Sequence, residues 1–316
     1  MPQRELGVWC FDELAGTLVD HRDRLEFRYD QNWLASDRPP LSQSLPLSGA
    51  FPDSAVGAFF GGLLPEGAPR QLLARRLGVS VDNDFGLLEQ LAGDTAGAVS
   101  LLAPGAIPGP QGTDVHWLTD DGLADLIEGL PTRPMHAGER GEYRLSLAGV
   151  QDKLPVVLDD AGHVGLTKGR TPSTHILKIP IPRLDDTVAN EAFCLAVGRA
   201  LGIHTAQATP RRVGEHEFLL VERYDRAVVD GATRRLHQED FCQALGIPSA
   251  RKYQSEGGPT LADCFGLLRR AAAIPAQEAV QLLDYVALSF LVANHDAHGK
   301  NYSVLYTPES SRAVLA

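Results

Sequence analysis

The feature that most constrains the fold is the segment AQEAVQLLDYVALSFLVA (276–293), which is apolar on nearly every side of a helix. A helix of that kind is normally buried, so the rest of the chain must supply a core around it. With 316 residues, 44% of them hydrophobic, the chain is long enough for about two domains. We therefore predict a globular protein in which this segment forms a buried helix.

Charge, cysteine content and the length of apolar runs argue against several classes of protein. Lys and Arg number 29 against 40 Asp and Glu, and the net charge of −11 disfavours direct binding to nucleic acid or anionic lipid. No apolar run is long enough for a membrane span, and the N-terminus lacks the pattern of a secretory signal or transit peptide. The four cysteines form no paired motif. We expect a cytoplasmic protein without membrane contact.

The order of expected strands and helices indicates an α+β chain. Three strand-like segments come first, at 7–11, 16–20 and 25–29. A helix follows, with Pro69 near its start and Gly78 as its C-cap. The Pro- and Gly-rich segment 103–112 has the composition of a linker, and a short strand and helix follow it between residues 114 and 128.

The second half of the chain is predicted to be a small sheet with one helix, followed by helices. Further strands are expected at 143–147, 153–158, 175–179, 206–213 and 216–222. Asp186 can cap a helix that ends before Gly202. After residue 234 the pattern is helical, and a strand at 302–306 follows the polar loop NHDAHGKN.

Asp296 and Asn301 in this polar loop have the D-x-x-x-x-N spacing of a protein-kinase catalytic loop. A carboxylate there can accept the proton of a substrate hydroxyl, and an amide oxygen can hold the cation that bridges the phosphates. Lys300, between them, would neutralise charge on the transferred phosphate. The alternative is a polar loop that ends a helix, with a solvated lysine.

Two histidines beside Asp296 leave another possibility open. His295 and His298 could belong to a metal-dependent phosphohydrolase, which would need further ligands such as His175 or His237. Isolated His-Asp pairs are usually incidental, so we weigh this interpretation below the kinase one.

Two upstream features suit the phosphates of a nucleotide. The turn Ser146–Lys153 joins two expected strands and can offer backbone N–H groups to an anion, although a plain hairpin turn has the same pattern. Lys178 lies in an alternating strand, and Glu191 follows thirteen residues later on a helix. That order matches the lysine and glutamate that pair in kinases, whereas an edge-strand lysine is the simpler alternative.

The segment Glu222–Arg226 follows a strand and precedes the helical part, where a kinase has the hinge that meets adenine. A charged loop between domains is an equally natural interpretation. The kinase hypothesis gains from the order of the features, namely turn, strand lysine, helix glutamate, linker, helix, D-x-x-x-x-N and strand.

Longer motifs make a resemblance specific. The chain resembles the HipA family of bacterial toxin serine/threonine kinases in LSLAGVQDKLPVV, THILKIP, NEAFCLAVGRALGI, FLLVERYDR, RLHQEDFCQALG, KYQSEGGP and NHDAHGKNYSVLY. GLLPEG and DFGLLEQLAGDTAGAVSLL are similar to the N-terminal subdomain of that family. Nearly the whole chain is covered.

The resemblance implies a two-lobed protein-kinase-like fold of the α+β class with an extra N-terminal α+β subdomain. We expect that subdomain at 1–140, the N-lobe at 141–225 and the helical C-lobe at 226–316. Family chains continue to a second metal-binding aspartate, so we expect the C-lobe to be incomplete at its C-terminus.

The resemblance also implies ATP and Mg²⁺ as cofactors and assigns the site residues by motif. Asp296 resembles the catalytic base, Asn301 a metal ligand, Lys178 the phosphate-contacting lysine and Ser146 the autophosphorylated serine. The spacing and order of the features add Lys300 to the catalytic residues and Glu191 as the partner of Lys178. The remaining nucleotide contacts are expected from Ala148, Gly149, Val150, Gln151, Lys153, Glu222 and Tyr224.

The function implied is a toxin kinase that phosphorylates a translation-related protein, such as an aminoacyl-tRNA synthetase, and itself. The implied partner is a helix-turn-helix antitoxin of the HipB type, with DNA bound only through that antitoxin. A catalytically impaired, pseudokinase-like module that binds an antitoxin is the main alternative. A small-molecule kinase is the third.

Overall fold

The computed structural model describes residues 4–21, 24–91, 95–108, 114–133, 147–149, 151–167, 171–306 and 312–316. The chain forms two compact units that are interleaved in the sequence. Unit 1 comprises Met1–Leu63, Ala96–Ile107 and Arg235–Ala316. Unit 2 comprises Leu64–Thr95 and Pro108–Arg234.

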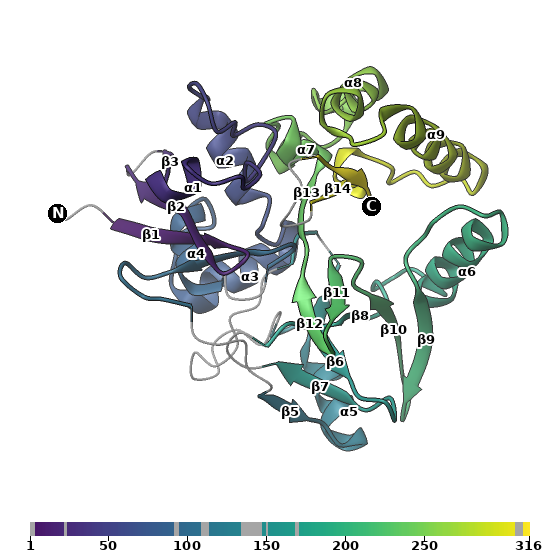
Figure 1. Ribbon diagram of the computed structural model, residues 1–316. Coiled ribbons are helices and arrows are strands. Elements are labelled where there is room, and N and C mark those ends of the chain that lie inside the picture. Colours follow the sequence, from purple (N-terminus) through teal and green to yellow (C-terminus); the bar gives the residue numbers. More distant parts are fainter. Residues whose placement is uncertain are drawn as a thin grey trace. The chain divides into compact units, whose positions relative to one another are not determined.

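A four-stranded antiparallel sheet forms the N-terminal part of unit 1 (Figure 1). Its strands, in the spatial order β3-β2-β1-β4, are β1 (Arg4–Cys10), β2 (Glu13–Asp20), β3 (Leu25–Tyr29) and β4 (Val99–Leu102). Alternate residues of β1 are buried, as expected for a strand with one face on a core. The short α1 (Gln31–Leu34) follows β3, and α2 (Asp53–Gly61) packs against that strand. The three strands expected from the sequence are confirmed.

The C-terminal part of unit 1 combines a three-stranded antiparallel sheet with three helices. The sheet has the order β13 (His237–Asp240), β14 (Ser303–Tyr306) and β15 (Val314–Leu315). The helices are α7 (Phe241–Ala244), α8 (Leu261–Ala271) and α9 (Pro275–Leu291). Three 3₁₀ turns lie at Ser249–Arg251, Gln254–Glu256 and Gly299–Asn301. Phe241, Leu267, Leu282, Val304 and Tyr306 form the centre of one core cluster.

The prediction that the apolar segment 276–293 forms a buried helix is wrong in one respect. The segment is helical, but only Glu278 and Leu282 of α9 are buried. Within the described residues, α9 packs on α8 and β15, which cover one side. Val280, Leu283, Phe290 and Leu291 are 56–84% exposed and recur at helical spacing. Apolar composition identified the helix but could not show which of its faces finds a partner.

A six-stranded antiparallel sheet is the centre of unit 2 (Figure 1). Its spatial order is β5 (Val115–Trp117), β7 (Val164–Thr167), β6 (Lys153–Leu158), β8 (His175–Lys178), β10 (His216–Glu222) and β9 (Ala208–Val213). The helices of this unit are α3 (Gly67–Leu77), α4 (Asp84–Leu91), α5 (Asp120–Gly129) and α6 (Thr187–Ala200). A hairpin of β11 (Arg226–Val229) and β12 (Ala232–Arg235) ends the segment.

Two helix-end predictions have different outcomes. Gly78 is the C-cap of α3 with a left-handed backbone (φ 67°), as expected. Asp186 occupies the N-cap of α6, but its side chain makes no cap hydrogen bond, so the predicted capping role is wrong. A capping side chain normally belongs to a residue with extended backbone, whereas Asp186 is left-handed (φ 54°).

Candidate functional site

The loop after α9 in unit 1 carries Asp296, Lys300 and Asn301. The Asp296 backbone N–H donates to Asn294 Oδ1 (3.0 Å), which tightens the first turn of the loop. The backbone N–H of His298 donates to Asn301 Oδ1 (3.1 Å), and the Asn301 N–H donates to the His298 carbonyl (3.0 Å). The loop is therefore held by its own polar side chains.

Asp296 is accessible and has one oxygen engaged. Its side chain is 65% exposed. The hydroxyl of Tyr253 donates to Asp296 Oδ1 over 2.5 Å, and His298 Nε2 lies 3.7 Å from the same oxygen. A carboxylate in this position can still accept a proton through its second oxygen. Tyr253 was not singled out from the sequence, because it lies 43 residues away with no spacing signal.

The side chain of Asn301 is held within the loop. Its side-chain oxygen already accepts the hydrogen bond from His298. A carbonyl oxygen has two lone pairs, so this bond leaves one for a cation. The donor chemistry of Asn301 therefore fits the role of a metal ligand.

Lys300 lies in a buried ion pair. Its Nζ donates to Asp240 Oδ2 over 2.6 Å, and the two side chains are only 5% and 10% exposed. Asp240 caps α7 through its other oxygen, which accepts the backbone N–H of Gln243 (2.9 Å). Lys300 thus ties the loop to the start of α7, and its charge is matched by Asp240 in this arrangement.

Gly299 allows the loop to lie close to neighbouring segments. A Cβ at this position would stand 2.7 Å from Pro259 Cγ and 2.9 Å from Cys242 Sγ. The Gly299 N–H also donates to the Lys252 carbonyl (3.3 Å). A side chain at Gly299 would therefore push the loop out of place.

In unit 2, Lys178 of β8 and Glu191 of α6 form an ion pair. Lys178 Nζ donates to Glu191 Oε1 over 2.5 Å, and the side chains are 20% and 31% exposed. Lys153 of β6 is the direct cross-strand partner of Lys178, so both side chains leave the same face of the sheet. Like charges directly opposite each other destabilise a sheet. A pair of opposed lysines is consistent with a site that takes an anion.

The turn before β6 is anchored at several points. The Gly149 carbonyl accepts the N–H of Glu66 (3.1 Å), and Pro65 forms a parallel bridge with Gly149. Gly149 has φ 108°, a backbone conformation that favours glycine. A Cβ there would lie 2.5 Å from Lys153 Nζ, so a side chain would displace the end of that lysine. The predicted contacts Ser146 and Val150 lie outside the described residues.

The two remaining turn residues lie on either side of this anchored glycine. Ala148 precedes Gly149 and is partly buried. Gln151 Nε2 donates to the carbonyl of Ile179 (2.9 Å), which ties the turn to the end of β8. The contact of the turn with Pro65 and Glu66 was not anticipated, because those residues lie far upstream in the sequence.

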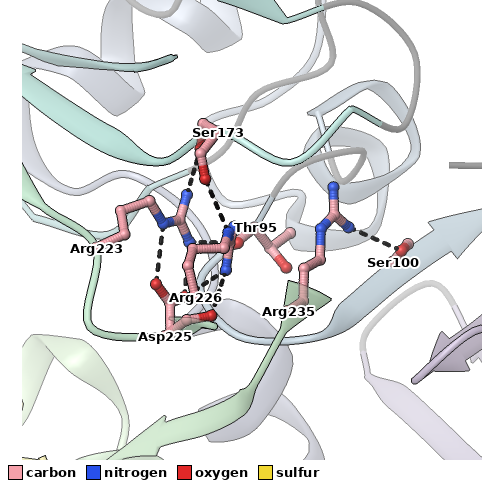
Figure 2. Close-up of polar contacts among 7 residues, drawn as sticks. All are labelled: Thr95, Ser100, Ser173, Arg223, Asp225, Arg226 and Arg235. Atoms are coloured by element: carbon pink, nitrogen blue, oxygen red, sulfur yellow. Dashed lines mark hydrogen bonds and ion pairs between the residues drawn. The ribbon is translucent and has the colours of Figure 1, made fainter. Parts of the chain in front are cut away.

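Three residues of the expected hinge segment, Arg223, Asp225 and Arg226, form a buried charge network (Figure 2). Arg223 donates to both carboxylate oxygens of Asp225, through Nε (2.9 Å) and Nη2 (2.7 Å). Arg223 also contacts Ser173 Oγ (3.0 Å) and the Thr95 carbonyl (2.9 Å). Arg226 adds contacts to Asp225 Oδ2 (3.0 Å) and the Ser173 carbonyl (2.9 Å).

The network fixes the segment that carries Glu222 and Tyr224. The side chains of Arg223, Asp225 and Arg226 are at most 4% exposed. Between them, Tyr224 is 41% exposed, and Glu222 is also exposed. The buried residues therefore hold the chain while the two expected nucleotide contacts remain accessible.

The described residues provide little for the phosphohydrolase interpretation. No three His, Cys, Asp or Glu side chains among them lie close enough to share a metal ion. His237 lies in unit 1, where its Nε2 is 2.8 Å from the Leu41 carbonyl, whereas His175 lies in unit 2.

In the described part of the chain, no helix combines the length and apolar character needed to cross a bilayer.

The sheets and helices of the two units, with a strand lysine paired to a helix glutamate and a D-x-x-x-x-N loop after a helix, define a protein-kinase-like fold. The family model described as HipA-like C-terminal domain matches residues 145–316, and the one described as HipA N-terminal domain matches residues 6–102. The chain belongs to the HipA family.

Similar proteins agree with this assignment. "Putative kinase Y4mE" of Sinorhizobium fredii is 45% identical over 99% of this chain and 76% of its own length. "Serine/threonine-protein kinase toxin HipA" of Shewanella oneidensis is 31% identical over 96% of this chain and 70% of its own length. A solved complex of Shewanella oneidensis HipA, HipB and operator DNA matches with a TM-score of 0.80 and 30% identity, covering 98% of this chain and 74% of that one. The resemblance to HipA and the expected fold class are confirmed.

Proposed function

We propose that the chain is an ATP- and magnesium-dependent serine/threonine protein kinase that acts as the toxin of a toxin–antitoxin pair. The observation that carries the proposal is the pair of opposed lysines, Lys153 and Lys178, with Glu191 bound to Lys178. Two cations on one face of a sheet suit the phosphates of a nucleotide. The names of the similar proteins support the same class of reaction.

The residues of unit 2 would bind the nucleotide. Lys153 and Lys178 would contact phosphate oxygens, and the anchored turn at Ala148, Gly149 and Gln151 would approach them through its backbone. Tyr224 and Glu222 would meet the base, since the network around Arg223 holds them at the surface.

The loop of unit 1 would carry out proton transfer. The acceptor hydroxyl oxygen attacks the γ-phosphorus, the bond from that phosphorus to the leaving ADP oxygen breaks, and Asp296 takes the hydroxyl proton. Asn301 would hold Mg²⁺, which neutralises charge on the phosphates when bound. Lys300 would keep the loop in place through Asp240, and charge neutralisation at the phosphate would require it to leave that partner.

The partners follow from the similar structure and from charge. HipA in the solved complex is found with HipB and operator DNA. A helix-turn-helix antitoxin is therefore the proposed partner, and a chain with a net charge of −11 would contact DNA only through it. A translation-related protein such as an aminoacyl-tRNA synthetase is the proposed substrate, and Ser146 the proposed site of autophosphorylation.

The proposal is tested with purified chain, radiolabelled ATP and magnesium. We expect phosphoryl transfer by the parent, loss of transfer in Asp296→Asn, and weakened ATP binding in Lys178→Ala. Asp284→Asn on the exposed side of α9 and Arg212→Ala on exposed β9 are matched controls that should behave as the parent. Transfer by Asp296→Asn at the parental rate would contradict the assigned role of the loop.

A second candidate is a nucleotide-binding module that binds an antitoxin without phosphoryl transfer. The buried ion pair between Lys300 and Asp240 favours it, because Lys300 in this arrangement does not neutralise charge on a phosphate. ATP binding that depends on Lys178, with no transfer by the parent, would support this candidate instead.

A further inference from the structure

Tyr253 approaches Asp296 more closely than any other side chain described around it. The Tyr253 hydroxyl oxygen is 2.5 Å from Asp296 Oδ1. Asp296 Oδ2 takes part in no hydrogen bond within the described part of the chain. The two oxygens of the carboxylate are therefore in different environments, with one engaged and the other exposed.

The tyrosine is itself held firmly. Its ring packs edge-on against the His298 ring, with the two centroids 5.0 Å apart. Lys252 Nζ lies 5.5 Å from the centroid of the Tyr253 ring. The Tyr253 carbonyl accepts the N–H groups of Glu256 and Gly258, both over 2.9 Å. A Cβ at Gly258 would stand 2.3 Å from the Arg251 carbonyl, so the segment is closely folded on itself. The hydroxyl is thus fixed by its ring and by its backbone.

We propose that Tyr253 is a positioning residue for Asp296. Its hydroxyl holds Oδ1 and sets the rotation of the carboxylate, so that Oδ2 faces the acceptor hydroxyl. The inference rests on the proposed kinase function, because it assigns Asp296 the role of base. Tyr253 keeps its own proton throughout, and the acceptor proton goes to Oδ2. An exposed carboxylate without such a donor would sample several rotamers, of which only some are productive.

Tyr253→Phe tests this with little disturbance, because it removes the hydroxyl and leaves the ring packed on His298. We expect kcat to fall roughly tenfold, the loss typical of one hydrogen bond to a charged group. The KM for ATP and the thermal midpoint should stay at parental values, because the ring stays packed on His298 and Tyr253 is not among the proposed nucleotide contacts. In an Asp296→Asn background, Tyr253→Phe should have no further effect.

Tyr285→Phe is the matched control, because it removes a hydroxyl that accepts a hydrogen bond from Gln281 Nε2 on α9 and lies outside the Asp296 loop. It should leave kcat unchanged. An unchanged kcat in Tyr253→Phe, with Asp296→Asn inactive, would overturn the positioning role while the proposed function stands. A kcat that rises in Tyr253→Phe would also overturn it, since the hydroxyl would then be blocking the place of the acceptor.

A second measurement does not depend on activity. In chain labelled with ¹³Cζ-tyrosine, the Tyr253 resonance is assigned by its loss in Tyr253→Phe. We expect this resonance to move in Asp296→Asn and to stay in Asp284→Asn. No movement would overturn the contact itself. If the resonance moves and the parent transfers no phosphate, the proposed function fails, and the positioning role fails with it.

Discussion

Lys153 and Lys178 face each other across β6 and β8, and like charges in directly opposite positions repel each other. Glu191 pairs with Lys178. We propose that an anionic ligand binds both lysines, because its negative charge would reduce the repulsion between them. At the scale of single residues, this pair is the clearest indication of what unit 2 binds.

Replacing Lys153 with methionine should therefore weaken ATP binding. We expect about a tenfold rise in Kd, the usual effect of losing one charge-assisted hydrogen bond to phosphate. The increase in thermal midpoint caused by saturating ATP should shrink accordingly. Arg212→Met removes a cation from an exposed position on β9 and should change neither quantity. Equal effects of the two substitutions, measured by calorimetry, would contradict a specific role for Lys153.

Ser146 provides a second test at residue scale, although it lies outside the described residues. A phosphoryl group adds about −1.5 to −2 charge, and it would stand near the turn that we expect to approach the ATP phosphates. Phosphorylation should therefore reduce ATP binding and switch the enzyme off. We expect mass spectrometry to find phosphate on Ser146 after incubation with ATP, and Ser146→Asp to bind ATP less tightly than the parent. Parental ATP affinity in Ser146→Asp would contradict the switch.

Glu239 of β13 is a buried acid outside the proposed site. It accepts hydrogen bonds from Ser42 Oγ (2.5 Å), Tyr306 (2.6 Å) and the Gln43 N–H (3.0 Å). Burial outweighs these donors and raises the pKa of Glu239 to about 7 from 4.5. The pKa of Glu239 is higher in the folded state than in the unfolded state, so protonated Glu239 favours folding. This contribution to stability is fully present below pH 4.5 and is lost as the pH rises through about 7.

The pH dependence of unfolding can test this directly. As the pH rises from 4.5 to 7, the titration of Glu239 should lower the free energy of unfolding by a few kcal/mol at most. Glu239→Gln cannot titrate and should flatten that part of the profile, even though it loses some absolute stability. Glu215→Gln, in an exposed turn, is the control and should keep the parental slope. A parental slope in Glu239→Gln, by urea denaturation, would contradict the assignment.

At the scale of elements, sequence patterns predicted what local forces determine. The strands β1, β2 and β3 and the cap at Gly78 follow from alternation and from backbone preference, and both are local. The four-residue strands β7, β11, β12 and β13 were not predicted, whereas β8 and β14, which have the same length, were. Their pairing is determined by neighbours in space.

The buried face of the α9 helix also could not be predicted from local sequence. Two residues of this helix allow a comparison between an exposed and a buried position. Phe290 is 84% exposed, whereas Leu282 is fully buried in the core beside Phe241. We expect Phe290→Ser to change the free energy of unfolding by less than about 1 kcal/mol. Leu282→Ala should cost about 2–5 kcal/mol through the cavity it leaves. A loss in Phe290→Ser as large as in Leu282→Ala would mean that the exposed side of α9 is covered in solution.

At the scale of the whole molecule, the site depends on contacts that no local pattern encodes. Spacing and order indicated Asp296 with Asn301 and Lys178 with Glu191, because the first pair lies in one loop and the second on consecutive elements. The contact between Tyr253 and Asp296 spans 43 residues, and the bridge between Pro65 and Gly149 joins distant segments. These contacts arise only when the chain folds, so the residues that support the site had to come from the structure.

Net charge gives the last prediction, which concerns the whole molecule. At −11, the chain alone should be repelled by operator DNA, so we expect no gel shift with the purified chain at moderate salt. A helix-turn-helix antitoxin should shift the DNA, and adding the chain should retard that complex further. Lowering the salt reduces the screening of the repulsion between the acidic chain and DNA, so binding of the chain alone should stay absent there too. A shift by the chain without antitoxin would contradict DNA contact through the antitoxin only, and would indicate a basic surface that the net charge conceals.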